Sequence, residues 1–195
     1  MQLSTTLSKP LATFVRRQNH FQNKLGHLIA WSSLSLVLIT ALVVVLRYGF
    51  ATGSIALQES MMYNHAILFM LGIAYTYQQD KHVRVDIFYG QFSERTKAKI
   101  DLIGTFVLTL PAMAFILWSG WDYVAVSWRI GETSAEAGGL AYLYLLKSLI
   151  LIMSIMLISQ ALSIAAQAWL TLYAPPAGPF SNPSSPENNE TEGKL

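Results

Sequence analysis

Four long apolar runs limit what this chain can fold into. They cover about residues 28–46, 60–77, 100–118 and 140–170, and only 12% of all residues are charged. A soluble domain usually has about 25% charged residues, and a helix that crosses a bilayer needs about 20 apolar residues. We therefore expect an all-α membrane protein, with four transmembrane helices in a membrane domain that covers residues 28–172.

The segments outside this domain differ sharply in composition. Residues 1–27 are basic and contain no acidic residue, and their leucine and phenylalanine side chains recur at spacings of three, four and seven. This pattern predicts an amino-terminal amphipathic helix in the membrane interface, with its basic face toward the lipid head groups. A disordered basic tail is the alternative. Residues 173–195 are rich in proline, serine, asparagine and acidic residues, which predicts a disordered polar tail.

The charged segment between the second and third apolar runs sets the orientation. This central loop and the amino-terminal segment hold most of the Lys and Arg residues, whereas the two opposite loops hold Arg47 and Arg129. The positive-inside rule therefore places both termini and the central loop in the cytoplasm. Within the loop, the alternating stretch HVRVDIFY predicts an extended piece at the level of the head groups.

Local signals define the second half of the chain. Ser93 followed by Glu94 predicts a helix that starts there and continues into the third run. Pro111 lies within that run, where we expect a kink. An aromatic belt follows, and we expect the helix to continue to Arg129 before an outer loop that ends in Gly138–Gly139.

Motifs of catalysis and cofactor binding do not emerge from the sequence. It has no G-x-x-x-x-G-K-[ST], H-E-x-x-H or G-x-S-x-G pattern and no cysteine. A haem between helices needs two histidines at matching depth, and we expect His27 and His65 at different depths. The net charge of +2 does not indicate a nucleic-acid partner. We expect a protein that is not an enzyme and holds no cofactor or metal.

Several polar residues fall within or beside the apolar runs, in the outer half of the membrane. These residues include Arg47, Glu59, His65 and Lys147. An ion pair of Glu59 with Lys147 or with Arg47 would lower the cost of burying both charges. Asn64 and His65 should face the bundle interior or a partner subunit. We favour a structural tie over a transport path, because no run shows a helix broken by glycine at mid-membrane.

Two stretches carry a family resemblance, LGIAYTYQQDKHVRVD and GETSAEAGGLAYLYLLKSLI. Over about residues 25–170 the chain resembles the small membrane (Q-type, DctQ-like) subunit of tripartite ATP-independent periplasmic (TRAP) transporters. The resemblance implies a bacterial inner-membrane scaffold subunit for a large M-type subunit, which takes up organic acids with sodium, and a role in docking a periplasmic substrate-binding protein. The candidate structural or interface residues are Arg47, Glu59, His65, His82, Arg84, Asp86, Glu132 and Lys147.

Two other classes of function remain open from the residues alone. One is a self-contained small transporter or channel formed by copies of this chain, and the other is a membrane anchor subunit of a redox complex. Solute flux through the chain reconstituted alone would favour the first, and a haem absorption band would favour the second.

Overall fold

All regular structure in the described part of the chain is helical. The computed structural model describes residues 2–80 and 92–173, with side chains from residue 8 onward. Its elements are α1 (Gln2–Gly49), α2 (Ile55–Gln78), α4 (Glu94–Gly104), the π-helix η1 (Thr105–Thr109), α5 (Leu110–Ile130) and α6 (Leu143–Tyr173).

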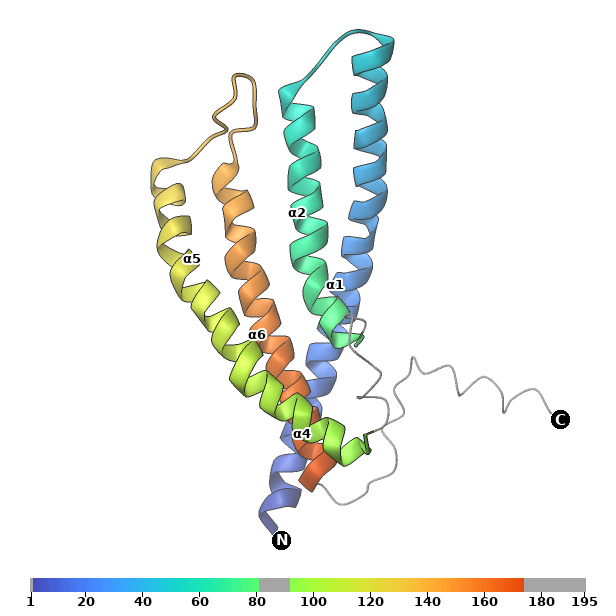
Figure 1. Ribbon diagram of the computed structural model, residues 1–195, viewed down its shortest axis with the longest axis vertical. Coiled ribbons are helices and arrows are strands. Elements are labelled where there is room, and N and C mark those ends of the chain that lie inside the picture. Colours follow the sequence, from blue (N-terminus) through green and yellow to red (C-terminus); the bar gives the residue numbers. More distant parts are fainter. Residues whose placement is uncertain (1, 81–91, 174–195) are drawn as a thin grey trace, which may run out of the picture.

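The long helices run alternately up and down in one bundle (Figure 1). The connections from α1 to α2 and from α5 to α6 lie at one end, here called the outer end. The start of α1 and helix α4 lie at the other, here called the inner end. Helix α6 packs against α1, α2, α4 and α5. It is the most buried helix, and its buried face carries small residues that let neighbouring backbones approach closely: Ser154, Ala161, Ser163, Ala165 and Ala168.

Helix α1 departs from the expected division at residue 27. It runs without a break from Gln2 to Gly49, so the amino-terminal segment is not a separate interfacial helix. Its amide side chains do not face head groups, since Gln22 is fully buried in the bundle while Phe21 is 54% exposed. The basic side chains of the segment, such as Arg16 and Arg17, are exposed, so a location of this face at the lipid head groups stays a prediction.

Three helical stretches of the described residues are long and apolar enough to cross a membrane. They are Ser8–Gly49, Glu94–Ile130 and Leu143–Tyr173. These stretches correspond to the predicted first, third and fourth crossings. Helix α2 has 24 residues and packs beside α1, but its polar residues lower its hydropathy. A fourth crossing by α2 stays a prediction.

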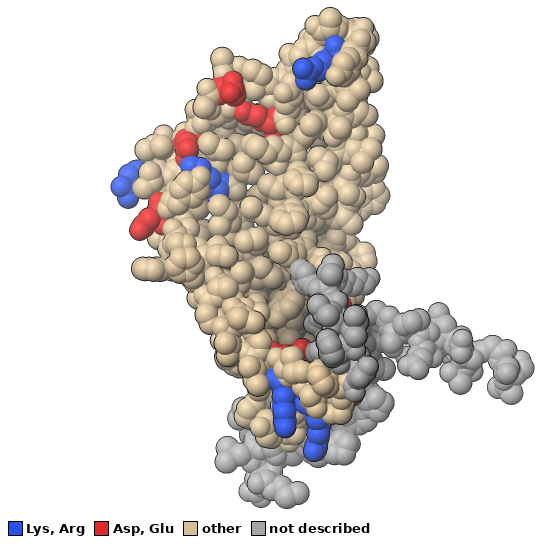
Figure 2. Space-filling model, in the orientation of Figure 1, with Lys and Arg blue, Asp and Glu red and all other residues tan. Residues whose placement is uncertain are grey.

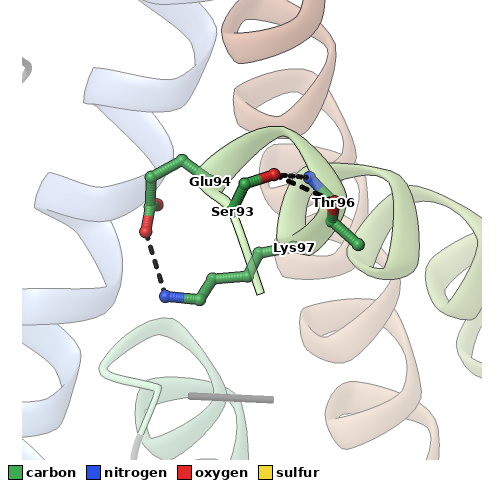
Figure 3. A network of polar contacts seen from close by, with 4 residues as sticks. All are labelled: Ser93, Glu94, Thr96 and Lys97. Carbon is green, nitrogen blue, oxygen red and sulfur yellow. Dashed lines mark hydrogen bonds and ion pairs between the residues drawn. The ribbon is translucent and has the colours of Figure 1, made fainter. Parts of the chain in front are cut away.

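The start of α4 confirms the predicted helix signal. The hydroxyl oxygen of Ser93 accepts a hydrogen bond from the backbone N–H of Thr96 at 3.3 Å (Figure 3). Lys97 forms an ion pair with Glu94 at 3.0 Å in the same turn. The side-chain cap satisfies one of the free N–H groups of the first turn, and the Glu94 carboxylate is favourable beside them.

The third run is one continuous helix with a local change of winding at Pro111. Between α4 and α5, the π-helix η1 places a hydrogen bond from the N–H of Leu110 to the carbonyl of Thr105. Proline has no N–H and its ring collides with the carbonyl four residues earlier, so a wider turn before it relieves the clash. Helix α5 continues to Ile130, as expected, and ends where Gly131 adopts a left-handed conformation with φ of 57°.

Close packing of α1 on α2 depends on Gly26. A Cβ atom at this position would lie 2.6 Å from two ring atoms of Tyr75 on α2. We predict that Gly26→Ala lowers the free energy of unfolding by about 1–3 kcal/mol, the usual cost of overpacking. Unfolding in detergent, followed by tryptophan fluorescence, measures the effect.

Gly104→Ala is the matched control for this substitution. Gly104 is helical, and nothing lies within 4 Å of an added Cβ there, so we expect no loss of stability. Equal effects of the two substitutions would contradict the proposed contact.

Candidate functional site

The Glu59 carboxylate joins α2 to the outer loop formed by residues 131–142. One carboxylate oxygen accepts a hydrogen bond from the hydroxyl of Ser134, and the other accepts the backbone N–H of Leu140 at 2.6 Å. The Ser134 hydroxyl itself accepts the N–H of Glu136 at 3.1 Å. These bonds hold the loop against the first turns of α2, so one acidic side chain connects the α1–α2 pair to the α5–α6 pair.

Two adjacent glycines shape this loop. Gly138 has a φ of 81°, a conformation that L side chains rarely adopt. Gly139 lies so close to the carboxylate that an added Cβ would be 2.7 Å from the Glu59 oxygen. The predicted loop that ends at Gly138–Gly139 is confirmed. The close approach of the Glu59 carboxylate explains why residue 139 is a glycine.

A second polar contact links the start of the outer loop to α6. The ammonium of Lys147 donates to Glu132 at 2.5 Å, and both side chains are partly buried. The same ammonium lies 4.0 Å from the ring centroid of Tyr123 on α5, a cation–π contact. Lys147 therefore ties the last turns of α5 and the following loop to its own helix.

The expected ion pairs of Glu59 are not formed in the described part of the chain. Lys147 pairs with Glu132 instead, and Glu59 is held by a hydroxyl and a backbone amide. Arg47 lies exposed at the end of α1 and has no ion-pair partner among residues 8–80 and 92–173. The sequence left this pairing open, and the outer loop supplies nearer partners to both charges: Ser134 and Leu140 to Glu59, and Glu132 to Lys147.

Hydrogen bonding lowers the pKa of both loop-associated carboxyls. The pKa of Glu59 lies below its ordinary value chiefly because the Ser134 hydroxyl and then the Leu140 amide donate to the charged form. The pKa of Glu132 is lowered chiefly by the hydrogen bond from Lys147. Both groups therefore carry negative charge at neutral pH, in the state that makes these contacts.

The remaining predicted residues lie in different places. His65 is exposed on α2, where its ring stacks on Phe69 with centroids 6.3 Å apart. His82, Arg84 and Asp86, with the extended piece predicted around them, lie outside the described residues, as does the tail from residue 174. Among the predicted residues that the structure describes, Glu132 and Lys147 lie together, while Arg47, Glu59 and His65 have different surroundings.

A set of amide side chains near the inner end was missed by the sequence analysis. Gln18 donates to the hydroxyl of Ser159 at 2.8 Å, and Gln160 donates to the Asn19 side chain at 3.4 Å, so both bonds join α1 to α6. Gln78 of α2 donates to the Asn19 carbonyl at 3.0 Å. The available signal was a repeated amide at spacings of three or four residues in the first helix, together with Gln160 inside an apolar run.

Neither the polar contacts at the outer end nor the amide bonds at the inner end have the character of a reaction centre. Among the described residues, no group of three or more His, Asp or Glu side chains could hold a metal ion. Each contact joins one helix to another or to the outer loop, so the chemistry these groups supply is the fixing of helix positions at the two ends of the bundle.

Comparison with models of protein families tests the family resemblance seen in the sequence. A family model for the DctQ component of tripartite ATP-independent periplasmic transporters matches residues 36–171. The chain belongs to this family. The DctQ component is the small permease part of a TRAP transporter and works with an M-type subunit and a binding protein. The DctQ family is a family of transporter components and not of enzymes. Neither the curated proteins nor the solved structures give a significant match.

The family match covers all the residues of the outer network, by which we mean the contacts of Glu59 and Lys147 with the outer loop. The matched range includes Glu59, Glu132, Ser134 and Lys147, whereas the amides of α1 at Gln18 and Gln22 precede it. The polar contacts at the outer end therefore lie within the part of the chain that matches the DctQ family model.

The Lys147–Glu132 ion pair leads to a stability prediction. Lys147→Met should lower the unfolding temperature in detergent, because it leaves a partly buried carboxylate without its ion-pair partner. Adding Glu132→Gln should restore most of the loss, and Arg129→Met at the exposed end of α5 should have little effect. If the unfolding temperature of the double variant is no higher than that of the single variant, the ion pair does not stabilise the fold. Combining Lys147→Met with Glu59→Gln should give additive effects, since the two groups have different partners.

Glu59 makes the docking of the outer loop sensitive to acid. Its pKa is lowered in the folded state, so its contribution to stability is full above the unfolded value of about 4.3 and is lost as pH falls through the lowered pKa. We predict that wild type loses unfolding temperature relative to Glu59→Gln as pH falls below about 4.3. Glu136→Gln, an exposed position of the same loop, is the control and should follow wild type. Parallel pH profiles of wild type and Glu59→Gln would contradict the assignment.

Proposed function

We propose that this chain is the small permease subunit of a sodium-driven TRAP transporter that imports organic acids. In this proposal it forms a fixed scaffold for the large M-type subunit and helps to dock the periplasmic binding protein. The family relationship supports the assembly, and the resemblance of the sequence supports the coupling ion and the class of solute.

The observation that carries the scaffold role is the continuity of the helices. Solute sites of secondary transporters are typically formed by helices that are unwound near mid-membrane. Each described helix of this chain keeps its helical winding, and even the turn before Pro111 is a π turn. The buried polar contacts join helices to each other, which suits a part that stays still while another subunit moves.

The distribution of charge supports an inner-membrane orientation with both termini in the cytoplasm. Of the Lys and Arg residues that the structure describes, seven lie in the first half of α1 or in α4, near the inner end, and three lie toward the outer end. Figure 2 shows acidic side chains among these outer cations. A broad uncharged zone separates the two ends on the face shown. The positive-inside rule assigns the inner end to the cytoplasm and the outer loop to the periplasm.

The outer loop suits a docking role because its shape is held by several contacts. Glu59 holds its second half, and the Lys147–Glu132 pair holds its start. A surface that is ordered before binding loses less conformational entropy when a partner docks. The periplasmic binding protein is the partner for which a preformed outer surface is useful.

Purification and transport measurements test this function together. The tagged chain, extracted from its native membrane in mild detergent, should retain a larger multi-span membrane protein. That complex, reconstituted with the binding protein, should take up an organic acid only with an inward sodium gradient, and the chain alone should give no uptake. Recovery without a larger membrane protein, or uptake by the chain alone, would refute the scaffold role.

A further inference from the structure

One face of α2 is left uncovered along much of the helix. The side chains on it follow one another at alternating spacings of three and four residues, and all are exposed: Ile55, Gln58, Met62, His65 and Phe69. We call this row the α2 seam. Alternating spacings of three and four are those of the residues by which one helix packs along another in a coiled-coil-like contact.

The opposite face of α2 is already used within the chain. The Asn64 side chain donates a hydrogen bond to the carbonyl of Ser32 on α1 at 2.9 Å, and Ala74 is fully buried in the core. The neighbouring residues Asn64 and His65 therefore point to different surroundings. Asn64 is satisfied inside the bundle, whereas His65 lies on the seam.

His65 is costly on a surface that faces lipid. It is six residues from Glu59, about 9 Å along the helix at 1.5 Å per residue, so it lies inside the apolar zone if α2 crosses the membrane. Within the described part of the chain, neither ring nitrogen has a hydrogen-bond partner, and the ring contacts only Phe69 by stacking. A polar side chain at this depth normally faces protein or water, since lipid supplies no hydrogen bonds.

The exposed apolar stretch of the neighbouring helix α1 lacks this feature. On α1, the exposed hydroxyls of Ser33 and Thr40 donate to carbonyls of their own helix at 2.6 and 2.7 Å. The large exposed residues there are apolar, such as Leu38, and on α5 they include Phe115. Lipid can cover this stretch of α1 without leaving a hydroxyl unpaired, which distinguishes it from the α2 seam, whereas α5 also exposes the charged residue Asp122.

The seam also has room for close approach. Its next position toward the inner end is Gly72, and no atom of the described residues lies within 4 Å of a Cβ added there. A small residue in a row of larger side chains lets a second helix backbone come near, which strengthens packing between membrane helices.

We propose that the α2 seam binds one transmembrane helix of the large permease subunit, with His65 hydrogen-bonded to a polar group of that helix. This inference rests on the proposed function, which supplies the large subunit as a partner. The apolar seam residues pack against the partner helix, and Gly72 marks where the two backbones come closest.

Photo-crosslinking in the assembled complex tests the position of the contact. Met62 and Phe69 are each replaced by the photo-reactive residue p-benzoylphenylalanine, and the controls carry it at Leu38 of α1 or Phe115 of α5. The controls are matched, since Phe69 and Phe115 are 63% and 62% exposed. Adducts with the large permease subunit, identified by mass spectrometry, should be several-fold more abundant from the seam than from the controls.

Substitution of His65 tests the hydrogen bond. His65→Leu should reduce recovery of the large subunit several-fold, and His65→Gln, which can still form a hydrogen bond, should retain more of it. His20→Leu, at an exposed histidine of α1, should leave recovery unchanged. The folded fraction of each variant, measured by size-exclusion chromatography in detergent, separates loss of binding from loss of folding.

The possible results distinguish a failure of this docking inference from a failure of the proposed function on which it rests. If the large subunit is recovered but its adducts come equally or only from α1 or α5, the seam is not its docking face, while the scaffold role stands. Unchanged recovery with His65→Leu, or adducts between two copies of this chain, would also overturn the inference. If no large membrane subunit is recovered with wild type, the proposed function itself fails.

Discussion

The structure depends on the need of polar side chains in an apolar bundle to find partners within protein. Lipid offers no hydrogen bonds, so an unpaired polar group at membrane depth raises the free energy of the folded chain. Exposed hydroxyls such as Thr40 meet this need with a carbonyl of their own helix. Asn64, Lys147 and Gln18 instead reach another helix or loop, and each such bond fixes the position of one element against another.

The two polar networks have complementary effects on the bundle. At the outer end, Glu59 and Lys147 hold a loop whose glycines allow it to close on the helices. At the inner end, amide side chains of α1 bond to α6, and the amide of Gln78 on α2 donates to the backbone carbonyl of Asn19 on α1. Between them, the core is formed by small and apolar residues, including Ala74, Met156 and Leu157. Apolar packing alone gives little choice between helix positions in lipid, so hydrogen bonds at both ends select one arrangement.

Elements whose cause is local could be predicted from the sequence. The apolar runs follow from composition, and the start of α4 follows from Ser93 and Glu94, because a helix cap involves residues only a few positions apart. The end of α5 near Arg129 was predicted in the same way. The continuity of α1 through residue 27 was not, because a pattern of polar and apolar residues does not say whether the polar side meets head groups or other helices.

Contacts between distant residues could not be derived from the same patterns. Depth in the membrane placed Glu59 and Lys147 near each other, but depth does not determine which side of a helix a group faces. The outer loop supplies Ser134, Leu140 and Glu132, and its path depends on two glycines and on how α5 and α6 pack. The buried amides were missed for a related reason, since Gln22 is polar in the sequence and yet fully buried in the fold.

Helix α2 shows how these constraints lead from fold to assembly. It is the long helix whose hydropathy falls short of a free-standing membrane span, yet it lies within the bundle between neighbours that qualify. Polar residues that lower its hydropathy either have partners inside the chain, as Asn64 does, or lie on its open face, as His65 does. A helix of this kind is stable in a membrane when protein covers both of its sides. The polar character of α2 is therefore what would be expected of a subunit that completes its fold by association, and it connects the physics of the single chain to the transporter family to which the chain belongs.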